Sequence, residues 1–178
     1  SPPRNRPVSR EPSIEKILMT ITAKEIITKL EELKLYYPHY MLFPILSENE
    51  VYAFECHFQI RIPADYRWFI TNVCNGRIGP GMRGGIYPLH EIQNILEIDV
   101  KNTPKEAKIT AEQIVSRPFM CPHSFEESEK LIDTVVPGML PISHVGFGEE
   151  YYLCVSGAER GYIWYRGETW YPFTALDH

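Results

Sequence analysis

The first half of the chain carries apolar residues at the 3.6-residue period of amphipathic helices. Thr22 and Glu25 have the spacing of a capping box, Ile21 and Ile26 that of a hydrophobic staple, and further apolar residues share one face of the helix that follows: Ile27, Leu30 and Leu33. Ser47 and Glu50 form a second capping box ahead of a similar series: Val51, Phe54 and Phe58. Capping-box spacings at 103–106 and 124–127 indicate further helix starts.

The most complete helix signal lies in the stretch IPADYRWFITNVCNG. Pro63 suits the first helical turn, and Asn75-Gly76 supplies a left-handed stop. Between them, four apolar residues are spaced i, i+3, i+4 and i+7: Tyr66, Phe69, Ile70 and Val73. We predict a helix that buries this face.

From Met139 onward the pattern changes to short strands separated by glycine or polar turns. The predicted strands lie in the stretches GMLPISHVG, EYYLCVSG, GYIWYRG and TWYPF. Helices first and an antiparallel meander last predict an α+β fold, with an antiparallel or mixed sheet and helices packed on one of its faces.

The stretch LCVSGAERGYIW has two glycines around a charged pair, which suits either a phosphate-binding loop or a hairpin. A phosphate loop needs a helix after its glycines, whereas Gly161 is followed by strand-like residues. We therefore predict a hairpin in which Gly157 and Gly161 adopt positive φ and display Glu159 and Arg160.

Composition fits one globular domain, with 178 residues of which 44% are hydrophobic. Residues 1–18 are rich in Pro, Ser and Arg and are interpreted as a flexible leader or linker remnant, so that the domain spans 19–178. Four cysteines without a close pair predict reduced, buried thiols and a cytoplasmic protein. No apolar run is long enough to cross a bilayer, so no membrane partner is expected.

The chain is acidic, with 18 basic and 23 acidic side chains and a formal net charge of −5. A protein that binds nucleic acid would carry a basic stripe, so nucleic acid is not an expected direct partner. The first 18 residues hold four basic and two acidic side chains, which leaves 14 − 21 = −7 for the remainder.

The titratable residues give no pattern of a catalytic or metal site. Cys56-His57 and Cys121-Pro122-His123 lack a second pair at a zinc-site spacing, so no metal or other cofactor is expected. The sequence leaves open a nucleophilic cysteine paired with a histidine that is distant in the chain. It also leaves open a pair of catalytic acids at Glu149-Glu150, although a solvated turn is the simpler interpretation of these two glutamates. The three tryptophans are interpreted as core or sheet residues, and not as a ligand cage: Trp68, Trp164 and Trp170.

Two blocks of the chain, RIPADYRWFITNVCNGRIGPGMRGGIYPL and LPISHVGFGEEYYLCVSGAERGYIW, resemble the SUKH superfamily. This fold is shared by fungal cell-wall assembly regulators and bacterial immunity proteins. The resemblance runs from about Ser47 to Trp164 and rests on residues that match in order: Pro63, Asp65, Tyr66, Phe69, Asn75-Gly76, Gly79-Pro80, Gly85-Ile86, Gly146, Gly148, Gly157, Gly161 and Trp164.

The resemblance implies a non-catalytic binding protein. Our leading hypothesis is an immunity protein that neutralises a cognate toxin, with a basic nuclease as the partner that an acidic inhibitor would attract. The alternatives are a regulatory scaffold module of the cell-wall regulator type and a small hydrolase. The candidate toxin contacts are residues expected in exposed loops and turns: Met82, Arg83, Glu149, Glu150, Glu159 and Arg160.

Overall fold

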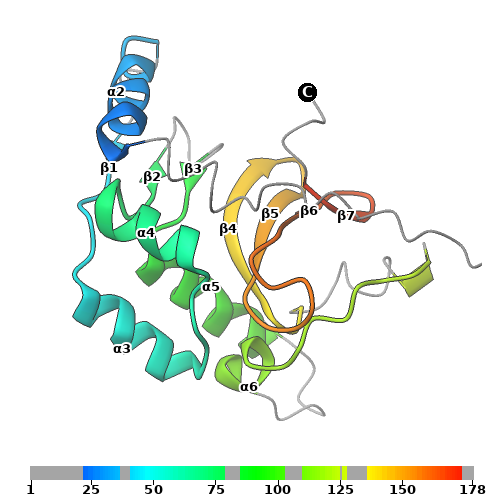
Figure 1. Ribbon diagram of the computed structural model, residues 1–178. Helices are drawn as coiled ribbons and strands as arrows, with labels where there is room; N and C mark the ends of the chain where they lie inside the picture. Colours follow the sequence, from blue (N-terminus) through cyan, green and yellow to red (C-terminus); the bar gives the residue numbers. More distant parts are fainter. Residues whose placement is uncertain are drawn as a thin grey trace, which may run out of the picture.

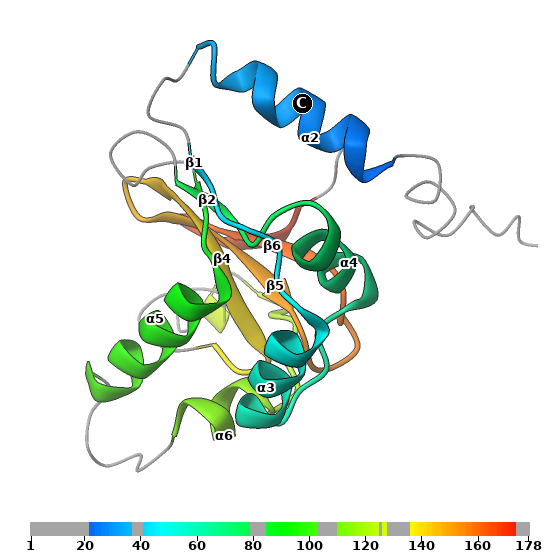
Figure 2. The same ribbon diagram turned by 90° about the vertical axis from the view of Figure 1, so that its left-hand side faces the viewer.

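The computed structural model describes residues 22–36, 41–78, 85–102, 110–124, 126–127 and 136–173. The helices in these ranges are α2 (Ala23–Leu33), α3 (Glu48–Phe58), α4 (Ala64–Asn72), α5 (Leu89–Asn102) and α6 (Ala111–Val115). Figure 1 shows α3, α4 and α5 gathered on one side of the longer strands, and α2 lies apart from them in both Figure 1 and Figure 2.

One antiparallel sheet holds all the described strands in their sequence order. The strands are β1 (Met41–Leu42), β2 (Arg77–Ile78), β3 (Gly85–Ile86), β4 (Met139–Gly146), β5 (Glu149–Cys154), β6 (Ile163–Arg166) and β7 (Trp170–Pro172). The meander predicted from Met139 onward is confirmed as β4 to β7. The α+β class, with helices on one side of an antiparallel sheet, is confirmed as well.

The alternation of side chains along β4, β5 and β6 creates two apolar clusters on opposite faces of the sheet. Leu140, Ile142 and Leu153 pack with the buried faces of α3, α4, α5 and α6 in the main core. The intervening residues belong to a second cluster, which Phe119 and Val136 complete: Met139, Tyr152, Cys154, Trp164 and Trp170. Trp164 is only 3% exposed and is therefore a core residue, as predicted.

The capping boxes at Thr22 and Ser47 are confirmed, because each hydroxyl accepts from the backbone amide of the predicted glutamate. The helix after Ser47 buries the predicted residues Val51, Phe54 and Phe58. In α2, by contrast, the predicted apolar face is only half-buried. The staple residue Ile21 lies outside the described residues.

Helix α4 confirms the prediction for the stretch after Pro63, which is its N-cap residue. Ile70 is fully buried, and the half-buried Tyr66 and Phe69 pack against the same core. The predicted stop is wrong, because α4 ends at Asn72, before Gly76. Gly76 has φ +90°, and a Cβ there would lie 2.5 Å from the carbonyl oxygen of Ile86, so this glycine is needed for close backbone packing.

Two helices were not predicted. Helix α5 buries Leu89, Ile92 and Leu96, which recur at helical spacing, and α6 begins with a capping box between Thr110 and Gln113. Both signals are present in the sequence. The helix start expected at 103–106 lies outside the described residues, whereas at 124–127 the amide of Glu127 donates to the hydroxyl of Ser124, as in a helix cap.

All four cysteines are free thiols. Cys74 and Cys154 are buried, as predicted, and burial raises the pKa of both, that of Cys154 to about 11. Cys56 departs from the prediction, since it lies on the exposed side of α3. None of the described helices combines the length and hydrophobicity that spanning a bilayer requires.

Candidate protein-interaction surface

Four of the six residues predicted as toxin contacts are among the described residues, and they lie at two opposite ends of the sheet. We call the end that holds the β4–β5 and β6–β7 turns the turn end, and the end that holds the β5–β6 connection (155–162) the loop end. Glu149 and Glu150 begin β5 at the turn end, and Glu159 and Arg160 lie beyond its other terminus. A six-residue strand spans about 20 Å, so the two pairs cannot contact one small site. Met82 and Arg83 lie outside the described residues.

The loop end is the hairpin predicted from the glycine pair. Leu153 pairs with Ile163, and both Gly157 and Gly161 have positive φ. Gly157 is also packed tightly, because a Cβ there would lie 2.8 Å from the carbonyl oxygen of Phe119. The strands on both sides of this connection exclude the alternative of a phosphate-binding loop that opens a helix.

Arg160 ties the hairpin to the segment between α3 and α4. Its Nη2 donates to the carbonyl oxygen of Arg61 at 3.1 Å. Beside this contact lies a groove of about 370 Å³, with Tyr52, Cys56 and Arg61 among its lining residues. The Arg61 guanidinium lies 6.0 Å from the ring centroid of Tyr52, which is 55% exposed. The loop end therefore presents arginine and tyrosine, two residue types enriched at protein interfaces.

Glu150 was expected in an exposed turn, and the structure places it instead inside a strand. Its carboxylate pairs with Arg166 on β6 and accepts a hydrogen bond from the Tyr152 hydroxyl at 2.8 Å. Its side chain is 19% exposed. Asp99 lies on the exposed side of α5, and partial desolvation together with the negative charge of Glu150 raises the pKa of its carboxyl. Glu150 is therefore held by contacts within the sheet and does not lie in an exposed turn.

Glu149 points to the other face of the sheet, because neighbouring strand residues alternate. It lies beside a row of aromatic rings that crosses three strands, which we call the aromatic row: Tyr151 on β5, Tyr165 on β6, Tyr171 on β7 and Phe173 just after it. Neighbouring rings in this row have centroids 4.8 to 5.4 Å apart. Burial raises the pKa of Tyr165 to about 12, and its hydrogen bond with Glu149 contributes.

The aromatic row is partly accessible. Tyr171 is 44% exposed, and Glu149, Tyr165 and Phe173 are half-buried. Tyrosine gives a large contact area at a low entropic cost, and its ring faces attract cations. A carboxylate next to tyrosine rings is therefore an arrangement suited to an arginine or lysine side chain of a partner.

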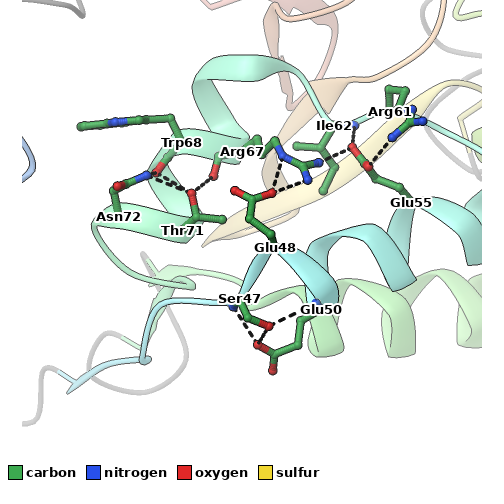
Figure 3. Close-up of polar contacts among 10 residues, drawn as sticks. All are labelled: Ser47, Glu48, Glu50, Glu55, Arg61, Ile62, Arg67, Trp68, Thr71 and Asn72. Atoms are coloured by element: carbon green, nitrogen blue, oxygen red, sulfur yellow. Dashed lines mark hydrogen bonds and ion pairs between the residues drawn. The ribbon is translucent and has the colours of Figure 1, made fainter.

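A buried ion-pair network joins α3 to α4 and was missed in the sequence (Figure 3). The Glu55 side chain is 2% exposed and accepts from Arg67 Nη1 at 2.8 Å, Arg61 Nη1 at 3.1 Å and the backbone amide of Ile62 at 2.8 Å. Arg67 also pairs with Glu48, whose side chain is 67% exposed. Burial alone would raise the pKa of Glu55, but the hydrogen bonds and the two arginines outweigh it and lower the pKa.

The Glu55 network is structural, because its buried carboxylate is held by Arg61, Arg67 and the backbone amide of Ile62. A sequence signal for it exists, since Glu55 stands on the same helical face as Val51, Phe54 and Phe58. A glutamate on an apolar face needs a cationic partner, and that partner is Arg67 on the next helix.

The residues that could have supported catalysis or metal binding are dispersed. Among the described residues, no three His, Cys, Asp or Glu side chains are grouped as they would be around a metal ion. His57, next to Cys56 in sequence, pairs with Glu112 at 3.2 Å. Glu149 and Glu150 point to opposite faces of β5, so they do not form a pair of acids that could share one substrate.

Comparison with known proteins shows the family of the chain. No curated protein matches it. A family profile described as the SMI1/KNR4 family (SUKH-1) matches residues 45–175, a range that includes α3 to α6, β2 to β7, the Glu55 network, the aromatic row and both ends of the sheet. The SUKH resemblance noted in the sequence is thereby confirmed, and the chain belongs to the SMI1/KNR4 family (SUKH-1).

Proposed function

We propose that this chain is an immunity protein that binds a cognate toxin, of basic nuclease type, and thereby neutralises it in the cell that produces both. Membership of the SUKH-1 family supports a role in binding rather than catalysis. The observation that carries the proposal in this chain is the combination of Glu149 with the aromatic row, because it offers a charged and aromatic surface of the kind that protein interfaces use.

The charge of the chain supports a basic partner. A nuclease must attract phosphate and therefore carries Lys and Arg around its substrate groove. An inhibitor with a net charge of −5 is attracted to that groove, which speeds the encounter and opposes substrate binding. In our proposal Glu149 contacts one such cation directly, whereas Glu150 acts only inside the protein.

The other residues predicted as toxin contacts have less direct roles in the proposal. Glu159 and Arg160 lie at the loop end, so they contact the toxin only if it extends along the length of β5. Met82 and Arg83 stay proposed contacts without a described position. A regulatory scaffold module remains the competing function, and it predicts host signalling proteins as partners.

The experiment uses the product of the neighbouring gene as the candidate toxin and measures association rates at two salt concentrations. We compare wild type with Glu149→Lys and with Glu159→Lys, which changes the net charge equally but lies at the loop end. Glu149→Lys should slow association about 10-fold or more and flatten the salt dependence, whereas Glu159→Lys should change the rate by less than about 3-fold.

Each alternative result has a distinct meaning. A tight complex with equal rates for the two variants would place the contact away from Glu149. Failure of the wild-type chain to bind the candidate toxin, together with recovery of a stable set of host signalling proteins, would favour the scaffold function.

A further inference from the structure

The groove at the loop end lies apart from the proposed toxin contact at the turn end. Its lining residues come from four segments: α3, residues 59–61, the end of α6 and the β5–β6 connection. Figure 1 shows α3, α6 and this connection at the same end of the molecule. Ile60 and Val155 line the groove with buried apolar side chains. Its volume of about 370 Å³ is in the range of ligand-binding clefts and suits a short segment of a partner.

Arg61 presents its guanidinium group at this groove. The side chain is 71% exposed, and Nη1 donates to the Glu55 carboxylate at 3.1 Å. The group lies over the Tyr52 ring, 6.0 Å from the centroid, so an aromatic face supports it. A guanidinium has five N–H donors in a planar fork, and one bond to Glu55 leaves others for a second carboxylate. Arg61 is therefore placed to bind an acidic side chain of a partner with two parallel hydrogen bonds.

The charges next to Arg61 favour an anion in the groove. The Glu55 carboxylate is 2% exposed and also pairs with Arg67 at 2.8 Å, so its charge is balanced inside the protein (Figure 3). Arg160 adds a second guanidinium group at the groove, because its Nη2 lies 3.1 Å from the carbonyl oxygen of Arg61. The surroundings of the groove are therefore cationic, although the chain has a net charge of −5.

Glu159, the acidic neighbour of Arg160, lies toward the second apolar cluster. Burial raises the pKa of the Cys121 thiol, and the negative charge of Glu159 raises it further, which places the carboxylate near that cluster. Ile60 and Val155, by contrast, connect the groove to the main core on the other face of the sheet. Glu159 therefore does not neutralise the groove.

Gln59 ends α3 in a conformation that favours a different residue type. Its φ of +54° and ψ of +40° are left-handed, and glycine is the residue most often found in this conformation at the end of a helix. The Gln59 side chain is exposed and lines the groove. Its amide can both donate and accept hydrogen bonds, as the backbone of an extended peptide requires. Because glycine would suit the backbone at least as well, a contact with a partner better explains this side chain.

We propose that the loop-end groove binds a short extended segment of a protein partner and that an aspartate or glutamate of the segment pairs with Arg61. Tyr52 supports the guanidinium, and Gln59 bonds to the backbone of the segment. The site lies at the opposite end of β5 from Glu149 and selects the opposite charge, so it goes beyond the proposed toxin contact. A nucleic acid is a poorer ligand, because a polyanion is repelled by the whole acidic chain, whereas a short segment interacts mainly with charges within about 8 Å.

The test selects random heptapeptides displayed on phage against the purified full chain, and fluorescence anisotropy then measures the affinity of the enriched peptides. We expect the enriched peptides to contain Asp or Glu. Changing that residue to Asn or Gln should weaken binding about 10-fold or more, because the bidentate pair with a guanidinium is lost. Arg61→Gln should weaken binding by a similar factor.

Two variants separate binding from folding. Gln59→Gly should weaken peptide binding about 3-fold or more while it keeps or raises the thermal unfolding midpoint, since glycine adopts positive φ without strain. The matched control is Lys34→Gln, which removes a cation that also pairs with an exposed glutamate, Glu31, but lies on α2. This control should leave peptide binding within about 2-fold of wild type.

The proposal is wrong if no peptide is enriched, or if the enriched peptides lack acidic residues. It is also wrong if they bind equally well to wild type and Arg61→Gln. A single-stranded oligonucleotide that binds the wild-type chain and is lost in Arg61→Gln, without acidic peptides among those enriched, would identify a nucleic-acid site instead. Because the toxin takes no part in these measurements, failure of the immunity function would leave this inference standing, and the reverse also holds.

Discussion

Replacement of Glu55 by glutamine removes one buried negative charge and keeps the size of the side chain. The carboxylate accepts three hydrogen bonds, two of them from guanidinium groups. Arg61 is 71% exposed, so its pair contributes little, whereas the pair with Arg67 is largely shielded from water. A shielded, charge-assisted hydrogen bond such as that between Glu55 and Arg67 contributes about 1.5 to 3 kcal/mol to the stability of the fold. We therefore expect a loss of about 2 to 3 kcal/mol for Glu55→Gln.

The matched control is Glu48→Gln, which removes a carboxylate that pairs with the same Arg67 from the exposed side. An exposed ion pair contributes about 0 to 1 kcal/mol, so this variant should lose less than about 1 kcal/mol. Denaturant unfolding of both variants measures the difference. Equal losses for the two variants would refute the argument that burial makes the Glu55 pair the stronger one.

The pH dependence gives a second readout of the same network. The pKa of Glu55 in the folded state is below its ordinary value of 4.5. Its ionisation therefore stabilises the fold fully above that value, and the contribution is lost as the pH falls through the lower, folded-state pKa. The difference in unfolding free energy between wild type and Glu55→Gln should be constant near pH 7 and should shrink below about pH 4.5. A difference that grows on acidification would contradict this assignment.

Two further pairs of variants test the sheet. Trp164→Ala should lower the free energy of unfolding by about 3 to 5 kcal/mol, because the Trp164 side chain is buried in the second apolar cluster. Glu159→Ala should lower it by less than about 0.5 kcal/mol. Equal small losses in denaturant melts would mean that Trp164 is not a core residue. Gly157→Ala should be clearly more destabilising than Gly161→Ala, although both have positive φ, because only at Gly157 would the new Cβ meet backbone atoms. Similar thermal unfolding midpoints for the two glycine variants would show that the close packing of Gly157 against Phe119 does not contribute to the stability of the fold.

The sequence predicts most of the fold because its strongest signals are local. The meander from Met139 onward follows from alternation and glycine turns, and α4 follows from its apolar period after Pro63. Gly76 shows where local reasoning fails. Its neighbours suggested a helix stop, but the need for glycine comes from the backbone of residues 86–88, which is distant in sequence.

The candidate surface is less predictable, because it depends on which face of the sheet each residue occupies. Glu149 and Glu150 look equivalent as an adjacent acidic pair, yet β5 directs one to the aromatic row and the other to Arg166. The hairpin register that separates them is set by the two-residue turn at Phe147. The Gly-Phe-Gly sequence between two strands allows a turn of that length to be recognised, but it does not show that the Phe147 side chain is exposed.

The most direct test of the proposed function is a titration of the purified chain into the candidate toxin while the activity of the toxin is followed on its own substrate. Our proposal predicts that toxin activity falls linearly and reaches zero near one chain per toxin molecule, because an immunity protein must bind tightly enough to leave no active toxin. Toxin activity that is unchanged at a several-fold excess of the folded chain would contradict the proposal.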